Sequence, residues 1–258
     1  MGIGCHDLTL FSPLAGRAAP ADGLGVARTI RGMNVLIFGA TGSAGGSVLR
    51  ASLSSPAVHE VRAITRRALP VTHAKLRTFI HRDYQDYTAV AEAFTAVDAC
   101  LFCLGVSATQ VSGEREYRIV THDLTLAAAR ALRAHSPAAA FHYISGQGTN
   151  SSSRFMWSRV KAQTERELIE RFGAVCWRPA VIDGEPSERA PRLYQALRPL
   201  FRLLRPFRSL YVTGEDLGLA MLQATAEEMR GCILENAQIR DLAERAPRLQ
   251  LIRRHGGH

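Results

Sequence analysis

The sequence predicts an α/β fold, a doubly wound parallel sheet with a small substrate-side cap towards the C-terminus. Three observations predict it. Short apolar runs alternate with stretches of helical periodicity along most of the chain. The first apolar run leads through a glycine turn directly into a helix. The chain has 258 residues, 47% of them hydrophobic, which is enough for one well-filled domain and too few for two large ones.

The first of these segments, residues 33–50 (MNVLIFGATGSAGGSVLR), predicts a strand, a tight turn and a helix in that order. Its VLIF run is short and rich in branched and aromatic residues, as in a strand buried on both faces. Gly39, Gly42 and Gly45 follow, three apart. A side chain at Gly39 or Gly42 would block the approach of a pyrophosphate to backbone N–H groups, while Gly45 lets the helix pack closely on the strand. An ordinary turn is the alternative, but this position between strand and helix favours dinucleotide binding.

This turn resembles the Gly-Ala-Thr-Gly-x-x-Gly turn of extended and atypical short-chain dehydrogenase/reductases, which include NmrA-like and Tat-interacting-protein-like members. The resemblance extends from residue 33 to about residue 241, and it implies a Rossmann fold and a dinucleotide cofactor without indicating the substrate. It implies the following cofactor-binding residues in the turn: Gly39, Thr41, Gly42, Ser43, Ala44 and Gly45.

Three parts are expected along the chain. Residues 1–32 hold six glycines and two prolines and lack periodicity, so they are expected to be a disordered leader. Met33 would itself serve as a start, which leaves a tail, an over-long start or a targeting peptide as explanations. Residues 33–182 are expected to form the NAD(P)-binding core, and 183–258 the substrate-side segment and closing elements.

Composition and cysteine placement exclude several other classes. The formal charge of +9 comes almost wholly from arginine, since Lys75 and Lys161 are the only lysines among 32 basic residues. No nucleic-acid motif is present, and no apolar run is long enough to cross a membrane. Cys100 and Cys103 form a CxxC within a predicted strand, where residues three apart point to opposite faces, so they cannot share a metal. Reduced thiols in a cytoplasmic protein are expected, and no metal site.

The second strand, expected at residues 60–65, ends before Arg66 and Arg67. An NAD-specific fold places an acidic residue there to hold the ribose 2′-hydroxyl, whereas arginine suits a 2′-phosphate. Two surface arginines without a role are the alternative. Because the acid is missing and the bases are present, the sequence favours NADP(H).

The third and fourth strands are expected at residues 77–81 and 97–104. The family resemblance implies that Asp83 and Tyr84 lie by the adenine, and that the backbone at Leu104 and Gly105 passes beside the cofactor. A helix over residues 113–133 is then expected to bury one apolar face in the core, made of Ile119, Leu124, Ala127, Ala131 and Leu132.

The fifth strand, expected at residues 141–145, puts Ser145 at a carboxyl end, where ligands of open parallel sheets bind. A nucleophile elbow would need glycine at positions 143 and 147, and this chain has Tyr143 and Gln147 there. The resemblance implies instead that Ser145 hydrogen-bonds a substrate carbonyl. A turn residue at the strand end is the alternative.

Next, Trp157 and Lys161 lie one helical turn apart where the family carries Tyr-x-x-x-Lys. The resemblance implies that Lys161 holds the nicotinamide ribose. An indole has no titration near neutrality, so Trp157 cannot replace the tyrosine as acid or base. A solvated helix lysine is the alternative, but one of only two lysines in the chain falls on the motif position.

The sixth strand, expected at residues 175–178, leads into Pro179 and Ala180, similar to the Arg-Pro-Gly of extended members with alanine in place of glycine. Residues 183–210 carry an apolar face beside arginines, typical of a cap with one wet face or of an interfacial membrane helix. Strand 211–213, a helix after Gly214, strand 232–235 and a helix from Gln238 are expected to close the fold.

Two function classes remain. One is an oxidoreductase- or epimerase-like enzyme in which another group replaces the tyrosine. The other is a non-catalytic NADP(H)-responsive protein of the NmrA-like type. The sequence indicates neither a substrate nor the oligomeric state, for which a homo-oligomer is one option.

Overall fold

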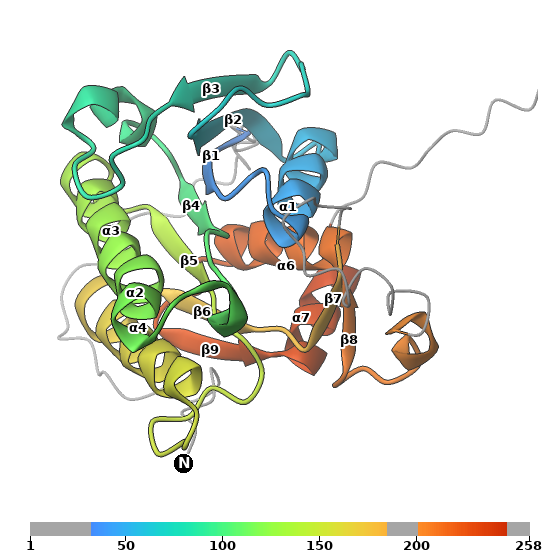
Figure 1. Cartoon of the computed structure of the whole chain (residues 1–258). Helices are drawn as coiled ribbons and strands as arrows, with labels where there is room; N and C mark the ends of the chain where they lie inside the picture. The colour runs from blue at the N-terminus through green and yellow to red at the C-terminus, as the bar shows by residue number, and fades with distance from the viewer. Residues whose placement is uncertain (1–31, 185–200, 247–258) are drawn as a thin grey trace, which may run out of the picture.

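The computed structural model describes residues 32–184 and 201–246 of the chain (Figure 1). The predicted leader, apart from Gly32, and most of the apolar face predicted for the cap lie outside the described residues. The domain boundaries therefore stay predictions.

The described chain is organised around a seven-stranded, wholly parallel sheet with strand order β3-β2-β1-β4-β5-β6-β9. This order reverses direction beside β1, as in a doubly wound α/β fold, and confirms the predicted fold class. The strands are β1 Met33–Phe38, β2 Val58–Thr65, β3 Leu76–Ile80, β4 Ala99–Phe102, β5 Ala140–Ile144, β6 Val175–Arg178 and β9 Cys232–Glu235.

Helices cover both faces of the sheet (Figure 1). One face carries α1 (Ser43–Ser54), α6 (Gly214–Ala226) and α7 (Asn236–Arg245). The other carries α3 (Leu124–His135), α4 (Met156–Phe172) and the 3₁₀ segment η1 (Thr88–Phe94).

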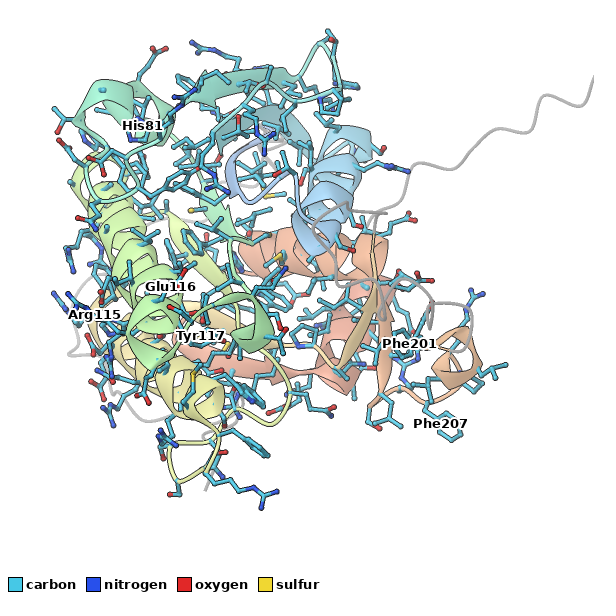
Figure 2. All side chains as sticks on the ribbon, in the orientation of Figure 1. His81, Arg115, Glu116, Tyr117, Phe201 and Phe207 are labelled. Carbon is cyan, nitrogen blue, oxygen red and sulfur yellow. The ribbon has the colours of Figure 1, made fainter. Side chains whose placement is uncertain are left out.

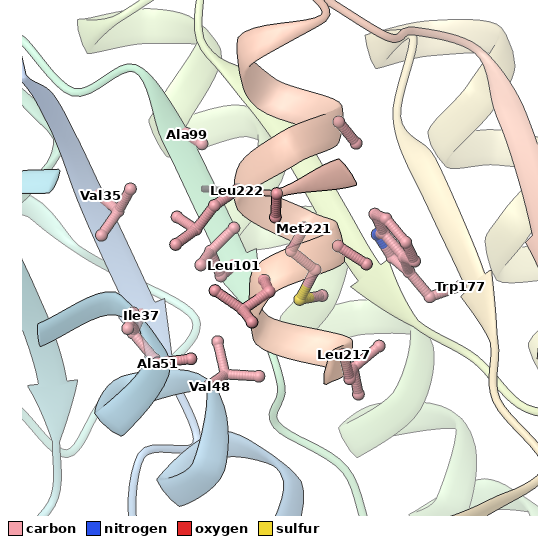
Figure 3. Close-up of a cluster of buried hydrophobic side chains, with 14 of the residues drawn as sticks. Val35, Ile37, Val48, Ala51, Ala99, Leu101, Trp177, Leu217, Met221 and Leu222 are labelled. Carbon is pink, nitrogen blue, oxygen red and sulfur yellow. The ribbon is translucent and has the colours of Figure 1, made fainter. Parts of the chain in front are cut away.

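The central strands supply both layers because successive side chains of a strand point to opposite faces. In β1, Val35 and Ile37 pack towards α1 and α6, while Leu36 and Phe38 pack into the opposite cluster. Figure 3 shows the first layer, where Met221 and Leu222 of α6 pack with Leu101 of β4 and Trp177 of β6. The same alternation puts Cys100 in one layer and Cys103 against the other, as predicted, and both are free thiols.

The helix predicted over residues 113–133 is interrupted. It consists of α2 (Glu114–Arg118), a π-helical turn η3 (Ile119–Asp123) and then α3. A π turn adds a residue to the helix, so the buried face after it is rotated from the one that an unbroken 3.6-residue period predicts. Leu126 and Ala129 are buried, whereas Ile119 is 36% exposed, and the prediction that Ile119 belongs to the core is wrong.

A second, two-stranded sheet lies beside the carboxyl end of β6. It pairs β7 (Val181–Asp183), which was not predicted, with β8 (Tyr211–Thr213) in parallel. Asn236, 1% exposed, holds it from the start of α7: its Oδ1 accepts from Ala180 N at 2.9 Å and its Nδ2 donates to Tyr211 O at 3.0 Å. This small sheet forms a wall of the site described next.

Candidate functional site

The glycine turn brings three chain segments into close contact at the carboxyl edge of the sheet. Gly39 has φ +75°, and a Cβ there would lie 2.6 Å from Cys103 O, at the end of β4. A Cβ at Gly45 would lie 2.2 Å from Gly39 O. Both positions therefore require glycine, the first for its backbone conformation and the second for the close helix–strand contact that the sequence predicted.

The first turn of α1 presents backbone donors at this edge. Gly42 is the N-cap and offers no side chain to accept from them. The N–H groups of Ser43, Ala44 and Gly45 have no acceptor within the helix, and the helix dipole adds partial positive charge beside them. This is a geometry that binds phosphate, and the glycines keep it open.

Two hollows border the turn on the side of β2 and β3. A small one of about 30 Å³ is lined by residues 39–41 and 64–67 with Tyr84 and Leu104. A groove of about 710 Å³ shares Arg66, Tyr84 and Leu104 with it. The groove is further lined by Arg82, Asp83, Gln85, Gly105, Val106, Gln110, Ile119, Val120 and Leu124. Ile119 and Leu124, which the sequence assigned to the core, thus face this groove.

Three arginines, Arg66, Arg67 and Arg82, stand around these hollows. All three are exposed, and none of their side chains makes a hydrogen bond or ion pair with any residue in the described part of the chain. Several arginines elsewhere are paired, for example Arg62 with Glu60 at 2.9 Å. Arg82 was not among the residues selected from the sequence, although its position next to Asp83, a predicted cofactor-binding residue, could have indicated it.

Asp83 and Tyr84 follow β3 at the groove. Asp83 Oδ1 accepts from Gln85 N at 2.9 Å, which fixes the carboxylate in the turn. Tyr84 is 8% exposed, and its ring contacts the ring of Phe38 edge-on, with the two ring centroids 6.0 Å apart. Across the groove, a Cβ at Gly105 would meet nothing within 4 Å, so the backbone there is open to a ligand. Their role towards an adenine stays a prediction.

Ser145 lies at the end of β5, held by its backbone N–H, which donates to Trp177 O at 2.8 Å. Its Oγ is 3.1 Å from Thr149 Oγ1, and Thr149 Oγ1 donates its one proton to Gly146 O at 2.8 Å. Ser145 must therefore be the donor in the pair with Thr149. Its hydroxyl presents lone pairs, not a proton, to any other group while this pair is intact.

Lys161 reaches Ser145 from α4. Its Nζ donates to Ser145 O, and a Cβ at Gly146 would lie 3.4 Å from Nζ. Burial lowers the pKa of Lys161 to about 8, an effect that Glu165 partly opposes. Glu165 is itself bound by Arg178 at 2.6 Å. The structure thus brings Ser145 and Lys161 together, as the spacing predicted.

Trp157, unlike Lys161, does not reach Ser145. It is half-buried, its ring stacks on Phe155 with centroids 6.3 Å apart, and its edge lies 3.6 Å from where a Cβ of Gly148 would be. Ser158, beside it in α4, pins the same loop by donating to Gly148 O at 2.8 Å. Trp157 therefore packs over the β5–α4 loop and is not among the described residues that line the cavity at Ser145.

That cavity, of about 390 Å³, lies between the β5 loop and the small sheet. Its described lining residues are Ser145, Gly146, Gln147, Pro179, Ala180, Val181, Ile182, Leu204 and Leu210. Pro179 was selected from the sequence. Leu204 and Leu210 belong to the segment of residues 183–210 that was predicted to lie on the substrate side. Their position against the β5 loop was not predicted, because that segment is far along the chain.

A parallel sheet in this order, with a glycine cradle at β1 and a serine and lysine at β5 and α4, defines a Rossmann fold of the short-chain dehydrogenase/reductase type. A model described as the NmrA-like family matches residues 32–130. The protein named fmp52, mitochondrial, of Aspergillus clavatus is 32% identical over 168 residues, which cover 61% of this chain and 70% of that protein. Its Aspergillus fumigatus counterpart is 31% identical over the same length, with the same coverage. This chain therefore belongs to the same family as the fmp52 proteins, and residues 32–130 match the NmrA-like model.

Solved structures agree with the fold. The Bordetella bronchiseptica enzyme WbmF in complex with NAD⁺ superposes with a TM-score of 0.62 at 14% identity, covering 83% of this chain and 77% of that one. At this identity the likeness concerns the fold alone.

The two Aspergillus relatives correct one expectation. Both are named as mitochondrial proteins, so the cytoplasmic location expected from the cysteine content is wrong. Reduced thiols indicate only that a compartment is reducing, and they do not distinguish one reducing compartment from another. Within residues 32–184 and 201–246, no helix is long and apolar enough to cross a membrane.

Proposed function

We propose that this protein binds NADP(H) along the carboxyl edge of its sheet and acts on a carbonyl or hydroxyl compound at Ser145. The observation that carries the proposal is the group of three arginines, Arg66, Arg67 and Arg82, left without partners among the described residues beside the glycine cradle. An unpaired guanidinium at the end of β2 is suited to a ribose 2′-phosphate, for which it supplies a fork of donors.

The residues present fit such a cofactor. The bare backbone at Gly39 and Gly45 leaves the first turn of α1 open to a pyrophosphate, and the groove by Asp83 and Gly105 accommodates an adenosine. When bound, the dinucleotide would supply or accept a hydride at its nicotinamide ring. Lys161 would hold the adjoining ribose hydroxyls. Ser145 would position the substrate oxygen, by accepting from a hydroxyl or, once its pair with Thr149 breaks, by donating to a carbonyl.

The test compares the protein's affinity for NADPH, which carries the 2′-phosphate, with its affinity for NADH, which does not. We expect NADPH to bind at least about tenfold more tightly than NADH, since a hydrogen bond to a charged group contributes more than 1.4 kcal/mol. Arg66→Asp should erase the preference, because Arg66 lines both hollows.

The matched control is Arg130→Asp, the same change of charge at an exposed position of α3 that does not line either hollow. It should leave both dissociation constants unchanged. Fluorescence titration of the reduced cofactors measures both. Equal affinity for NADPH and NADH in the unmodified protein would refute the assignment of the arginines.

A second candidate is a non-catalytic protein that responds to NADP(H). Two observations favour it: the position of the family's proton-donating tyrosine holds Trp157, and the Ser145 proton is directed at Thr149. Cofactor affinity is expected under both candidates, so they differ only in turnover.

A further inference from the structure

The cavity beside Ser145 differs in character from the cofactor groove. Its described walls beyond the β5 loop are Pro179, Ala180, Val181 and Ile182 on one side and Leu204 and Leu210 on the other. None of the described lining residues carries a charge. Leu210 is 40% exposed, so the apolar surface continues to the mouth of the cavity.

Several polar groups of this lining are already engaged. Gln147 Nε2 donates to Ser209 O at 3.1 Å, and Gln147 N donates to Pro179 O at 3.0 Å. Ser145 Oγ is paired with Thr149. A carbonyl oxygen can accept from Ser145 once that hydroxyl turns away from Thr149, but further polar groups on the ligand would be desolvated against carbon, which costs free energy unless they find partners.

Among the side chains that the structure describes, the arginines on the bordering segments do not supply an anion site either. Arg178, at the end of β6, is bound by Glu165 at 2.6 Å and by Glu235 at 3.1 Å. Arg208 is bound by Asp241 at 2.5 Å and Glu244 at 2.6 Å. Arg205 is exposed and does not line the cavity.

We infer that the ligand of this cavity is an uncharged, lipophilic carbonyl compound, with its hydrocarbon chain against Leu204 and Leu210 and its oxygen accepting from the Ser145 hydroxyl once that hydroxyl has turned away from Thr149. This rests on the proposed function and narrows it to a substrate class. The inference excludes substrates that carry phosphate or carboxylate groups from this cavity. The cavity volume of about 390 Å³ lies within the range of small-molecule pockets, and its apolar walls make the burial of each methylene favourable.

Leu204 and Leu203 provide a matched pair for testing it. Both belong to the 3₁₀ turn η4 (Arg202–Leu204), which leads to the loop of Phe207 at the outer edge of the molecule (Figure 2). Leu204 is half-buried and lines the cavity, while Leu203 is 69% exposed and does not.

The experiment measures ligand binding by calorimetry, with the full-length protein saturated by NADP⁺ so that no ketone is reduced. The ligands are 2-butanone, 2-hexanone, 2-octanone and 2-decanone, and 9-oxodecanoate, which carries a carboxylate at the far end of the decanone chain. We expect affinity to rise about fourfold per methylene over the first part of the series. The carboxylate should bind at least about tenfold more weakly than 2-decanone.

Leu204→Asp should weaken 2-decanone at least about tenfold, and Leu203→Asp should leave it unchanged. Leu204→Ala provides a smaller perturbation if the aspartate impairs folding, and NADPH affinity reports in each variant that the fold is retained. A flat chain-length series, equal affinity for 9-oxodecanoate, or equal effects of the two leucine variants would overturn the inference while leaving cofactor binding intact. Absence of NADPH binding would instead refute the proposed function, and the ligand series would then be run without NADP⁺ to test the cavity alone.

Discussion

Replacing Lys161 with methionine tests the ribose end of the proposed site. The ammonium has three N–H donors, of which one is used by Ser145 O, so two are free to meet the hydroxyls of a ribose. Hydrogen bonds to a charged group contribute about 1.5 to 3 kcal/mol. Lys161→Met keeps an unbranched side chain and removes every donor, so the dissociation constant for NADPH should rise by about one to two orders of magnitude.

The pH dependence makes the test specific. Burial lowers the pKa of Lys161 to about 8, so the ammonium is lost just above neutral pH. NADPH affinity should be constant near pH 7 and fall by up to about tenfold per pH unit above pH 8, as the charged fraction falls. The methionine variant should show a flat profile over the same interval.

The assay is a titration of NADPH fluorescence between about pH 7 and pH 9.5. Lys75→Met is the matched control, because Lys75 is the only other lysine and its Nζ donates to Ser55 O at 2.8 Å, away from the site. The control should reproduce the unmodified protein in affinity and in pH profile. An affinity of Lys161→Met within about twofold of the unmodified protein, or a flat profile in the unmodified protein, would refute the role assigned to Lys161.

Two further predictions concern stability and turnover. Because the folded pKa of Lys161 lies below its ordinary value of 10.5, unfolding takes up a proton between about pH 8 and pH 10.5, so this residue's contribution makes the free energy of unfolding rise with pH, by at most about 1.4 kcal/mol per unit. Urea unfolding of the unmodified protein minus Lys161→Met should show that rise, and a pH-independent difference would contradict the burial of the ammonium. Trp157→Tyr should introduce a proton donor one helical turn from Lys161 and raise NADPH-dependent reduction of 2-octanone above a weak or absent native rate. Robust native turnover that survives Trp157→Phe would exclude the non-catalytic candidate.

Most of the sheet could be predicted from the sequence because its strands are buried. Strands β1, β6, β8 and β9 have the bounds expected, since each is followed directly by a glycine, proline or asparagine, residues that favour a turn or the start of a helix. The edge strand β3 was expected one residue late, at 77–81 instead of Leu76–Ile80, because its side chains are mostly exposed and give a weak pattern.

Two features escaped prediction for physical reasons. The π turn at Ile119–Asp123 leaves no mark in hydrophobic periodicity, which assumes a constant helical repeat. Strand β7 has three residues and gains its stability from pairing with β8, which follows only after a long connection. The first error turned Ile119 from a groove residue into a core residue. The second left unpredicted the strand pairing beside which Leu204 and Leu210 line the cavity.

The same distinction applies to the candidate site. Ser145 and Lys161 were predictable because each follows from local geometry, a strand end and a helical repeat. The pairing of Ser145 with Thr149 was not, because it depends on the loop between Gly146 and Thr149 folding back on the strand end.

That loop determines which group can move a proton. With Trp157 unable to titrate and the Ser145 proton given to Thr149, Lys161 is the titratable side chain that the structure brings against Ser145, through the backbone oxygen. A reduction at Ser145 would then need its proton to come from Lys161, directly or through a ribose hydroxyl, or need the Ser145–Thr149 pair to break. The ammonium of Lys161 that would hold the cofactor is thus also the nearest proton source. Loss of turnover in Lys161→Met therefore does not distinguish a cofactor-binding role from a role as general acid. Only affinity and turnover measured separately, across the pH interval in which Lys161 titrates, separate the two.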